Sequence, residues 1–219
     1  MMQCCPQTAT EVFDGLFARH SALRSCEADI RLAFMLVTEV FRGGGKLLVC
    51  GNGGSAADSE HIVGELMKSF RFKRPVDQEF AEAYQSLNGV EVPSWLEGAL
   101  PTVSLVSQTS LMTAFSNDES AVGVFAQQVY GYGNRGDALL IVSTSGSSPN
   151  VVEAARVAIA RDMRVVALTG ASRSPLYELA NVCVRVPENE TFRVQEMHLP
   201  IYHALCAAIE AELFGGETR

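Results

Sequence analysis

The chain has 219 residues, 47% of them apolar, so it is long enough to bury a hydrophobic core and fits one domain. Its net charge of −8 argues against a general nucleic-acid-binding surface, which needs a basic stripe, but permits a small anionic substrate. No apolar run approaches the ~20 residues that span a bilayer, and the first residues show no secretory signal.

The six cysteines form neither a CxxC pair nor the framework of a small disulfide-rich domain. This usage is typical of a protein in the reducing cytosol. Cys4 and Cys5 can be interpreted as a metal-binding or redox-active pair, but their position near the N-terminus favours the interpretation that they lie in a frayed terminus. These features predict a cytoplasmic protein with one domain, which we place at residues 8–215.

Helical and strand-like segments alternate along the chain, starting with helices within residues 10–42. The apolar face of these first helices can cover a sheet or pair with another subunit, and we favour oligomer contacts. The expected helices lie at residues 12–25, 28–41, 56–70, 121–130, 150–161, 174–180 and 192–214. The expected strands lie at residues 46–50, 102–106, 138–143, 164–169 and 182–186. Such alternation predicts βαβ units and an α/β fold with a parallel sheet.

One long polar segment, residues 71–101, interrupts this alternation and contains the only tryptophan, Trp95. Within it, residues 77–87 are expected to form an amphipathic helix. A connection of this length is usually functional or has structure of its own. Two interpretations stay open, a surface excursion and a lid or subunit clasp near the functional site.

The first of two Gly/Ser loops, GNGGS at residues 51–55, follows a strand pattern and precedes a helical one. Glycines let the backbone approach an anion closely, and a helix N-terminus offers free N–H groups and a positive dipole end. Ser55 is expected to cap the following helix, with Asp58 in a variant of the capping box. Taken alone, this loop is equally compatible with a plain strand-to-helix turn.

The second loop, STSGSS, favours a phosphorylated ligand more strongly. Ser148 is expected to be a helix N-cap and Pro149 the first helical residue. The hydroxyls of Ser143, Thr144, Ser145 and Ser148 then lie beside one helix N-terminus, where a structural turn needs only one or two. In open α/β sheets, ligands bind where strands end and helices begin. The motifs of a P-loop and of a dinucleotide site are both missing.

A possible metal-binding set combines two expected helices. His61 and Glu65 are four residues apart, so they share one helix face, although such a pair is also compatible with a surface hydrogen bond. Gln195 and His203 lie about 12 Å apart along the last helix. Two imidazoles, a carboxylate and an amide can bind a divalent metal such as zinc, although Gln is an unusual zinc ligand. Pro200 is expected to kink this helix, which either brings the side chains together or displaces His203.

Together these motifs resemble the sugar isomerase (SIS) domain family, most closely its phosphoheptose isomerase branch. The resemblance is carried by GNGGSAADSEHIVGEL, the Asn117-Asp118 pair, STSGSSPNVVEA, VVALTG and RVQEMHLPIYH. It covers residues 12–214 apart from the insertion at 71–101, and its motifs are specific in combination. It implies a five-stranded parallel sheet flanked by helices in a flavodoxin-like, three-layer arrangement. It also implies a homotetramer with active sites between subunits.

The same resemblance implies a sugar-phosphate substrate and one zinc ion per subunit. Zinc would be held by His61, Glu65, Gln195 and His203, and Glu65 and His203 would be the catalytic acid–base residues. The expected substrate contacts are Asn52, Gly53, Gly54, Ser55, Asn117, Asp118, Ser143, Thr144, Ser145, Ser148 and Gln195.

The implied activity is aldose–ketose isomerisation of sedoheptulose 7-phosphate through an enediol, in the synthesis of heptose precursors. The insertion at residues 71–101 departs from the family pattern and bears on the exact sugar. The alternatives are another sugar-phosphate isomerase of this fold, a non-catalytic member such as the replication-initiator-associating protein, and a sugar-phosphate sensor. Glu65 and His203 favour an enzyme, because the matching positions of that non-catalytic relative are not acid–base residues.

Overall fold

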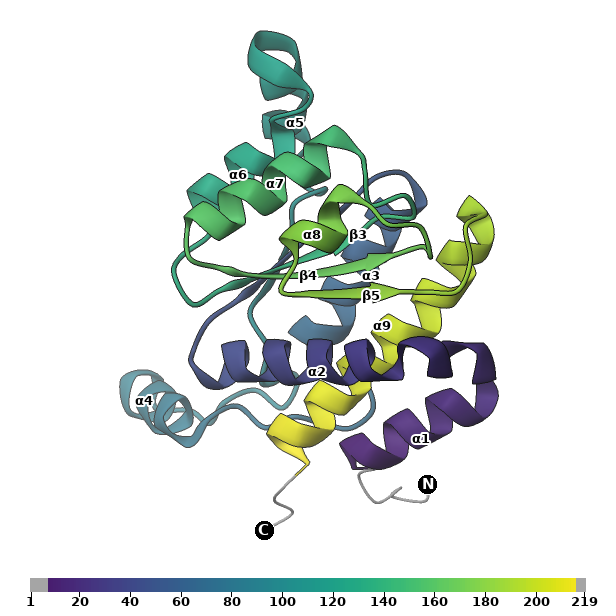
Figure 1. The fold of residues 1–219 in the computed structure, drawn as a ribbon. Coiled ribbons are helices and arrows are strands. Elements are labelled where there is room, and N and C mark those ends of the chain that lie inside the picture. The colour runs from purple at the N-terminus through teal and green to yellow at the C-terminus, as the bar shows by residue number, and fades with distance from the viewer. Residues whose placement is uncertain (1–7, 216–219) are drawn as a thin grey trace.

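The computed structural model describes residues 8–215 and contains a five-stranded parallel sheet (Figure 1). The strand order is β2-β1-β3-β4-β5. The strands are β1 Leu47–Gly51, β2 Thr102–Ser104, β3 Ala138–Val142, β4 Arg164–Thr169 and β5 Val182–Arg185. All five strands expected from the sequence are confirmed, although β2 is shorter than predicted. From β1 the chain first adds β2 on one side of the sheet and then adds β3, β4 and β5 on the other side. The switch point of the sheet therefore lies at the C-terminal ends of β1 and β3, where ligands bind in such folds.

Helices cover both faces of the sheet, as predicted (Figure 1). One face carries α2 Glu27–Arg42, α3 Gly54–Met67 and α9 Thr191–Phe214, and the other carries α6 Val124–Tyr132, α7 Pro149–Ala160 and α8 Pro175–Leu179. Successive residues of a strand point to opposite faces, so Leu47 and Val49 join the core under α2, α3 and α9. Leu48 and Cys50 join the core under α6 and α7. The strands are apolar throughout because both faces are covered.

The first helix packs on the outside of the α9 layer. α1 (Ala9–Arg19) contacts α9 and buries Phe13 and Phe17. The 3₁₀-helix η1 (Ser21–Cys26) then connects α1 to α2, so the single helix expected over residues 12–25 is wrong in its second half. The apolar face of α1 is therefore buried against other parts of the same chain.

Part of α2 keeps apolar side chains at the surface. Leu32 is 50% exposed and Met35 is 58% exposed. The structure thus shows the covering role of the N-terminal helices, while their expected oligomer contacts stay a prediction.

The insertion contains the amphipathic helix predicted for it, α4 (Gln78–Asn88), none of whose residues is buried. In Figure 1, α4 projects from the side of the molecule opposite the arrowheads of β4 and β5. It therefore does not cover the C-terminal edge of the sheet in its own chain. The base of the insertion is fixed by a buried ion pair, in which Nε of Arg74 lies 2.8 Å from Oε1 of Glu210 on α9.

A second projection lies at the other end of the molecule (Figure 1). It consists of α5 (Thr109–Phe115) and the π-helical turn η2 (Ser116–Ser120). Helix α6 begins after this turn at Val124, three residues later than the sequence predicted.

Among residues 8–215, no helix is long and apolar enough to cross a membrane. Four cysteines of this range are free and buried: Cys26, Cys50, Cys183 and Cys206. Cys4 and Cys5 lie outside the described residues.

Candidate active site

Three helix N-termini meet in one pocket at the C-terminal ends of β1 and β3. Helix α3 begins there at Gly54, α7 at Pro149 and α9 at Thr191. The cavity has a volume of about 290 Å³ and is lined by Asn52, Gly53, Gly54, Ser55, Val142, Ser143, Thr144, Ser145, Ser148, Thr191 and Gln195. No described residue that lines it is acidic. Helix N-termini offer N–H groups and positive dipole ends, so this pocket is suited to an anion such as a phosphate group.

The first loop enters α3 through a glycine that no other residue could easily replace. Gly53 has a φ of 58°, in the left-handed region that favours glycine. A Cβ on Gly51 would lie 2.6 Å from the carbonyl oxygen of Ser55, so a side chain there does not fit either. Gly53 is the N-cap of α3, and the predicted cap by Ser55 with a capping box to Asp58 is wrong. Because Gly53 is the N-cap, α3 begins at Gly54, one residue before Ser55. Ser55 therefore belongs to the first turn of α3, and it lines the pocket.

The second loop has the helix start that the sequence predicted. Ser148 is the N-cap of α7 and Pro149 is its first residue. The side-chain amides of Asn52 and Asn150 form two reciprocal hydrogen bonds of 2.9 Å, which join the second loop to the first. Asn150 was not predicted as a site residue, because a pairing of two loops 98 residues apart leaves no local pattern.

Thr191 is a further lining residue that the sequence analysis did not single out. It is the first residue of α9, so its hydroxyl lies where that helix contributes its N-terminal end. A Thr at the start of an expected helix is a recognisable signal, although a weak one.

A carboxylate and two imidazoles meet between α3 and α9. The Nε2 atom of His61 lies 3.2 Å from Oε1 of Glu65 and 3.3 Å from Nε2 of His203. One potential ligand atom from each of the three side chains lies within 4.8 Å of the others. Helix α9 continues through Pro200, so the proline does not remove His203 from this cluster. We call these three residues the His–Glu–His cluster.

The surroundings of His203 favour its neutral form. Burial lowers the pKa of His203, the neighbouring His61 lowers it further, and Glu65 opposes both effects. The Glu65 side chain is only 15% exposed. A neutral imidazole beside a carboxylate can bind a metal or exchange a proton.

Gln195 lies at the end of this helix pair that borders the pocket lined by the two Gly/Ser loops, which we call the phosphate-loop pocket. A Cβ on Gly54 would lie 2.6 Å from its Nε2 atom, so its amide rests against the first turn of α3. His61 follows seven residues later on α3, about 10 Å along the helix axis. The predicted role of Gln195 in substrate contact agrees with this position, and its role as a metal ligand stays a prediction.

Asn117 and Asp118 lie apart from the other predicted residues. They belong to η2, on the projection visible in Figure 1, and Nδ2 of Asn117 donates to Oδ1 of Asp118 at 2.8 Å. Neither lines the pocket of its own chain. Their predicted substrate contacts therefore stay a prediction.

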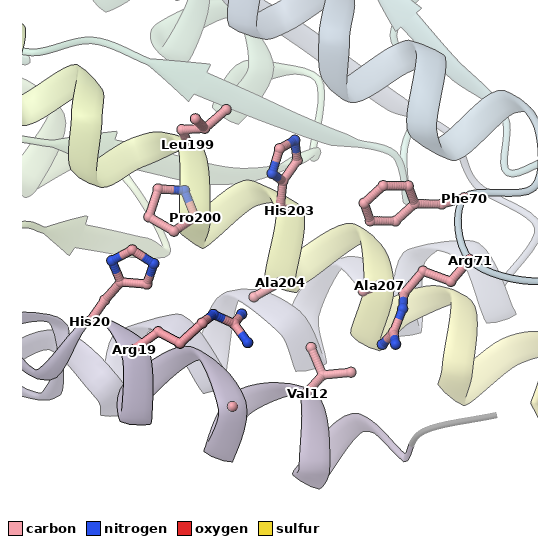
Figure 2. Close-up of a pocket in the computed structure, with 11 residues that line it drawn as sticks. Val12, Arg19, His20, Phe70, Arg71, Leu199, Pro200, His203, Ala204 and Ala207 are labelled. Atoms are coloured by element: carbon pink, nitrogen blue, oxygen red, sulfur yellow. The ribbon is translucent and has the colours of Figure 1, made fainter. Parts of the chain in front are cut away.

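A larger cavity of about 450 Å³ borders the cluster between α1 and α9 (Figure 2). Figure 2 shows Arg19 reaching into it from α1 and Arg71 from the loop that follows α3. His203 is part of its wall, and the ring of Phe70 lies 5.8 Å from the His203 ring, centroid to centroid. The His203 side of the cluster therefore borders an open cavity into which two arginine side chains reach.

Comparison with known proteins agrees with this architecture. The model of the SIS domain matches residues 17–170. The chain belongs to the SIS domain family. It is 35% identical over 202 residues to a phosphoheptose isomerase of Akkermansia muciniphila, covering 92% of this chain and 95% of the relative. It is 37% identical over 204 residues to a phosphoheptose isomerase of Shewanella baltica, covering 92% of each.

A solved structure of the family has the same fold. The phosphoheptose isomerase of Neisseria gonorrhoeae superposes with a TM-score of 0.71 at 32% identity, covering 93% of this chain and 96% of that one. The family and fold class predicted from the sequence are therefore confirmed. The two Gly/Ser loops lie at the switch point of the sheet, where open α/β sheets generally bind their ligands.

Proposed function

We propose that the chain is an aldose–ketose isomerase that converts sedoheptulose 7-phosphate into D-glycero-D-manno-heptose 7-phosphate. The observation that carries this proposal is the His–Glu–His cluster, which places a carboxylate and an imidazole together on the helix pair whose ends form the phosphate-loop pocket. The relatives named phosphoheptose isomerase, which match over nearly the whole chain, support the same activity. The reaction belongs to heptose precursor synthesis in the cytoplasm.

The phosphate-loop pocket would hold the 7-phosphate end of the sugar. Three helix N-termini and the hydroxyls of Ser143, Thr144 and Ser145 supply donors to its oxygens. The phosphate takes no part in the isomerisation, so its binding energy can be used to orient the reacting carbons.

The acid–base residues would transfer protons between the first two carbons. Glu65 removes a proton from C1 of the ketose, and the C2 oxygen gains a proton, which gives the enediol. Glu65 then returns its proton to C2, while the C1 hydroxyl loses its proton and becomes the aldehyde. His203, whose lowered pKa keeps it neutral, can carry the proton between the two oxygens.

We propose that the cluster also holds one zinc ion. Gln195, expected as the fourth ligand, would have to turn its side chain away from Gly54 to reach that ion. In a tetrahedral zinc site with bonds of about 2.0–2.1 Å, neighbouring ligand atoms lie about 3.3 Å apart. The distances of 3.2 and 3.3 Å around Nε2 of His61 fit that spacing. Where the Nε2 lone pair of His61 faces the Glu65 carboxylate, a bound cation would remove their mutual repulsion. When bound, zinc would polarise the substrate carbonyl and stabilise the enediolate oxygens.

The proposed assembly is a homotetramer. Asn117 and Asp118 project from their own chain, so we expect them to complete the site of a neighbouring copy. The exposed Leu32 and Met35 on α2 are available for such contacts.

An assay with purified protein tests the proposed activity. Sedoheptulose 7-phosphate is incubated with the protein, with and without added zinc, and the aldose product is measured. We expect turnover by the wild type, and loss of turnover with retained sugar-phosphate binding in Glu65→Gln. Glu153→Gln, at a half-buried glutamate on α7 that pairs with Arg156 and lies outside the cluster, is the control and should keep full activity. Tight binding without turnover by the wild type would instead indicate a sensor or scaffold.

A further inference from the structure

Tyr202 connects the His–Glu–His cluster to a carboxylate that does not belong to it. Its side chain lies on α9 and is only 1% exposed. Its hydroxyl oxygen lies 3.1 Å from Oδ1 of Asp58 and 3.1 Å from Nδ1 of His61, both on α3. One buried hydroxyl therefore bridges a carboxylate and an imidazole.

The number of available protons determines the direction of both bonds. An ionised carboxylate only accepts, and a tyrosine hydroxyl has one proton to donate. Tyr202 therefore donates to Asp58, and its oxygen accepts the N–H of His61 at Nδ1. A tyrosine hydroxyl ordinarily ionises only near a pH of about 10, so it carries its proton at neutral pH.

This direction decides which nitrogen of His61 carries a lone pair. A neutral imidazole has one N–H, and here it lies at Nδ1. Nε2 then presents its lone pair to Glu65 Oε1 at 3.2 Å and His203 Nε2 at 3.3 Å. Metal-binding histidines generally donate their other N–H to an oxygen acceptor, which fixes the tautomer and the ring orientation.

The aromatic ring of Tyr202 has a separate role. Its centroid lies 5.5 Å from that of His61 and 5.0 Å from that of His203, and both contacts are edge-on. The ring thus packs against both imidazoles, and removing only the hydroxyl leaves this packing in place. A Tyr202→Phe variant therefore separates the hydrogen bonds from the packing.

We propose that Tyr202, anchored by Asp58, is a positioning residue that holds His61 as the Nδ1–H tautomer and so prepares the cluster for a divalent cation. This inference rests on the metal site of the proposed function. We expect the hydrogen bonds that join Asp58, Tyr202 and His61 to contribute measurably to the affinity for the metal.

The affinity for Zn²⁺ is the primary measurement, made on metal-free full-length protein by competition with a zinc-binding dye. Tyr202→Phe should bind Zn²⁺ about 10- to 100-fold more weakly than the wild type. Asp58→Ala should weaken binding as well, because the Tyr202 proton is then free to turn toward Nδ1 of His61. The double variant should lose little more than either single variant, since both substitutions act through one chain of hydrogen bonds. Thermal unfolding shows whether each variant is folded.

Tyr177→Phe is the matched control. Tyr177 is a more exposed tyrosine on α8 and contacts Arg173 and Arg185, so its change should leave zinc affinity unaltered. The second measurement is the ¹⁵N spectrum of the His61 ring in the metal-free protein, which should show the Nδ1–H tautomer in the wild type and a loss of that preference in Tyr202→Phe.

Three results would overturn the inference: no zinc binding by the wild type, zinc affinity of Tyr202→Phe within about twofold of wild type, or a wild-type His61 protonated at Nε2. Isomerase turnover is a separate measurement. If the wild type binds zinc in the Tyr202-dependent way but turns over no sugar phosphate, the inference stands and the proposed function fails.

Discussion

The Nε2 atoms of His61 and His203 face each other at 3.3 Å, although the residues are 142 positions apart in the chain. Helices α3 and α9 pack side by side on one face of the sheet and bring the two rings together. Two nitrogens this close can share one proton or one cation, but they resist carrying two protons, in agreement with the lowered pKa of His203.

Loss of the His203 ring should remove both proton transfer and metal binding. We expect His203→Ala to lower kcat by about 10²–10⁴-fold, the usual contribution of a positioned acid–base group. Turnover of sedoheptulose 7-phosphate and zinc content per subunit are the measurements. His20→Ala is the control, because His20 lines the same cavity beside His203 but does not belong to the cluster. Equal effects of the two changes would contradict this assignment.

A methyl group at Gly54 should disturb the contact between α3 and Gln195. The new Cβ would lie 2.6 Å from Nε2 of Gln195, so that amide must move. We expect Gly54→Ala to lose about 10- to 100-fold in kcat/KM, because small displacements in a site are costly.

Gly64→Ala is the matched control on the same helix. A Cβ at Gly64 meets no atom within 4 Å, so activity should be unchanged. Its unfolding free energy should rise by about 0.5–1 kcal/mol, since alanine favours a helix interior over glycine. Kinetics and chemical denaturation of both variants separate the local effect of Gly54 from a general effect of adding a side chain to α3.

The buried pair of Arg74 and Glu210 should be important for stability. Both side chains are 0% exposed, and Arg74 also donates to the carbonyl oxygens of Glu65 and Leu66 at the end of α3. Arg74→Met leaves the Glu210 charge buried without its ion-pair partner, which typically costs about 3–5 kcal/mol. Urea unfolding measures this loss.

The exposed pair of Arg42 and Glu212 provides the comparison for that measurement. Arg42→Met should change stability by at most about 1 kcal/mol, because solvent screens such pairs. The double change of Arg74→Met with Glu210→Leu should recover part of the loss. A single Arg74→Met variant that is as stable as the wild type would show that the pair contributes no net stability.

His198 should make the protein less stable at acidic pH. It is completely buried on α9, and burial lowers its pKa from 6.5 to about 4. Between those values the unfolded chain binds the proton and the folded chain does not, so this contribution is absent above pH 6.5 and grows as the pH falls toward 4. The shift corresponds to about 3 kcal/mol in total.

Replacing His198 by leucine tests this pH dependence. Unfolding free energies of the wild type and His198→Leu are compared from pH 7.5 to pH 4. The variant should lose less stability across this range, although its carboxylates still titrate. Parallel pH profiles for the two proteins would rule out titration of His198 as the cause.

The alternation of apolar runs and Gly/Ser loops was enough to predict the fold and the phosphate-loop pocket. Strands buried on both faces have a strong local pattern, as in β3 and β4. Loops that follow parallel strands come together at one edge of the sheet, so their motifs indicate a common pocket before any contact is known. The cap of α3 was mispredicted because the left-handed conformation of Gly53 is not visible in a capping pattern.

The sequence by itself determined the order of the elements, the two Gly/Ser loops and the candidate set of His61, Glu65, Gln195 and His203, because spacing and residue type are local properties. Only the tertiary structure decided that α9 passes through Pro200 and brings His203 to His61, and that Asn117 and Asp118 lie apart from their own pocket. It also revealed the bridging hydroxyl of Tyr202 and the buried partner of Arg74. These contacts join residues more than a hundred positions apart, and they depend on how whole helices pack, which no local pattern specifies.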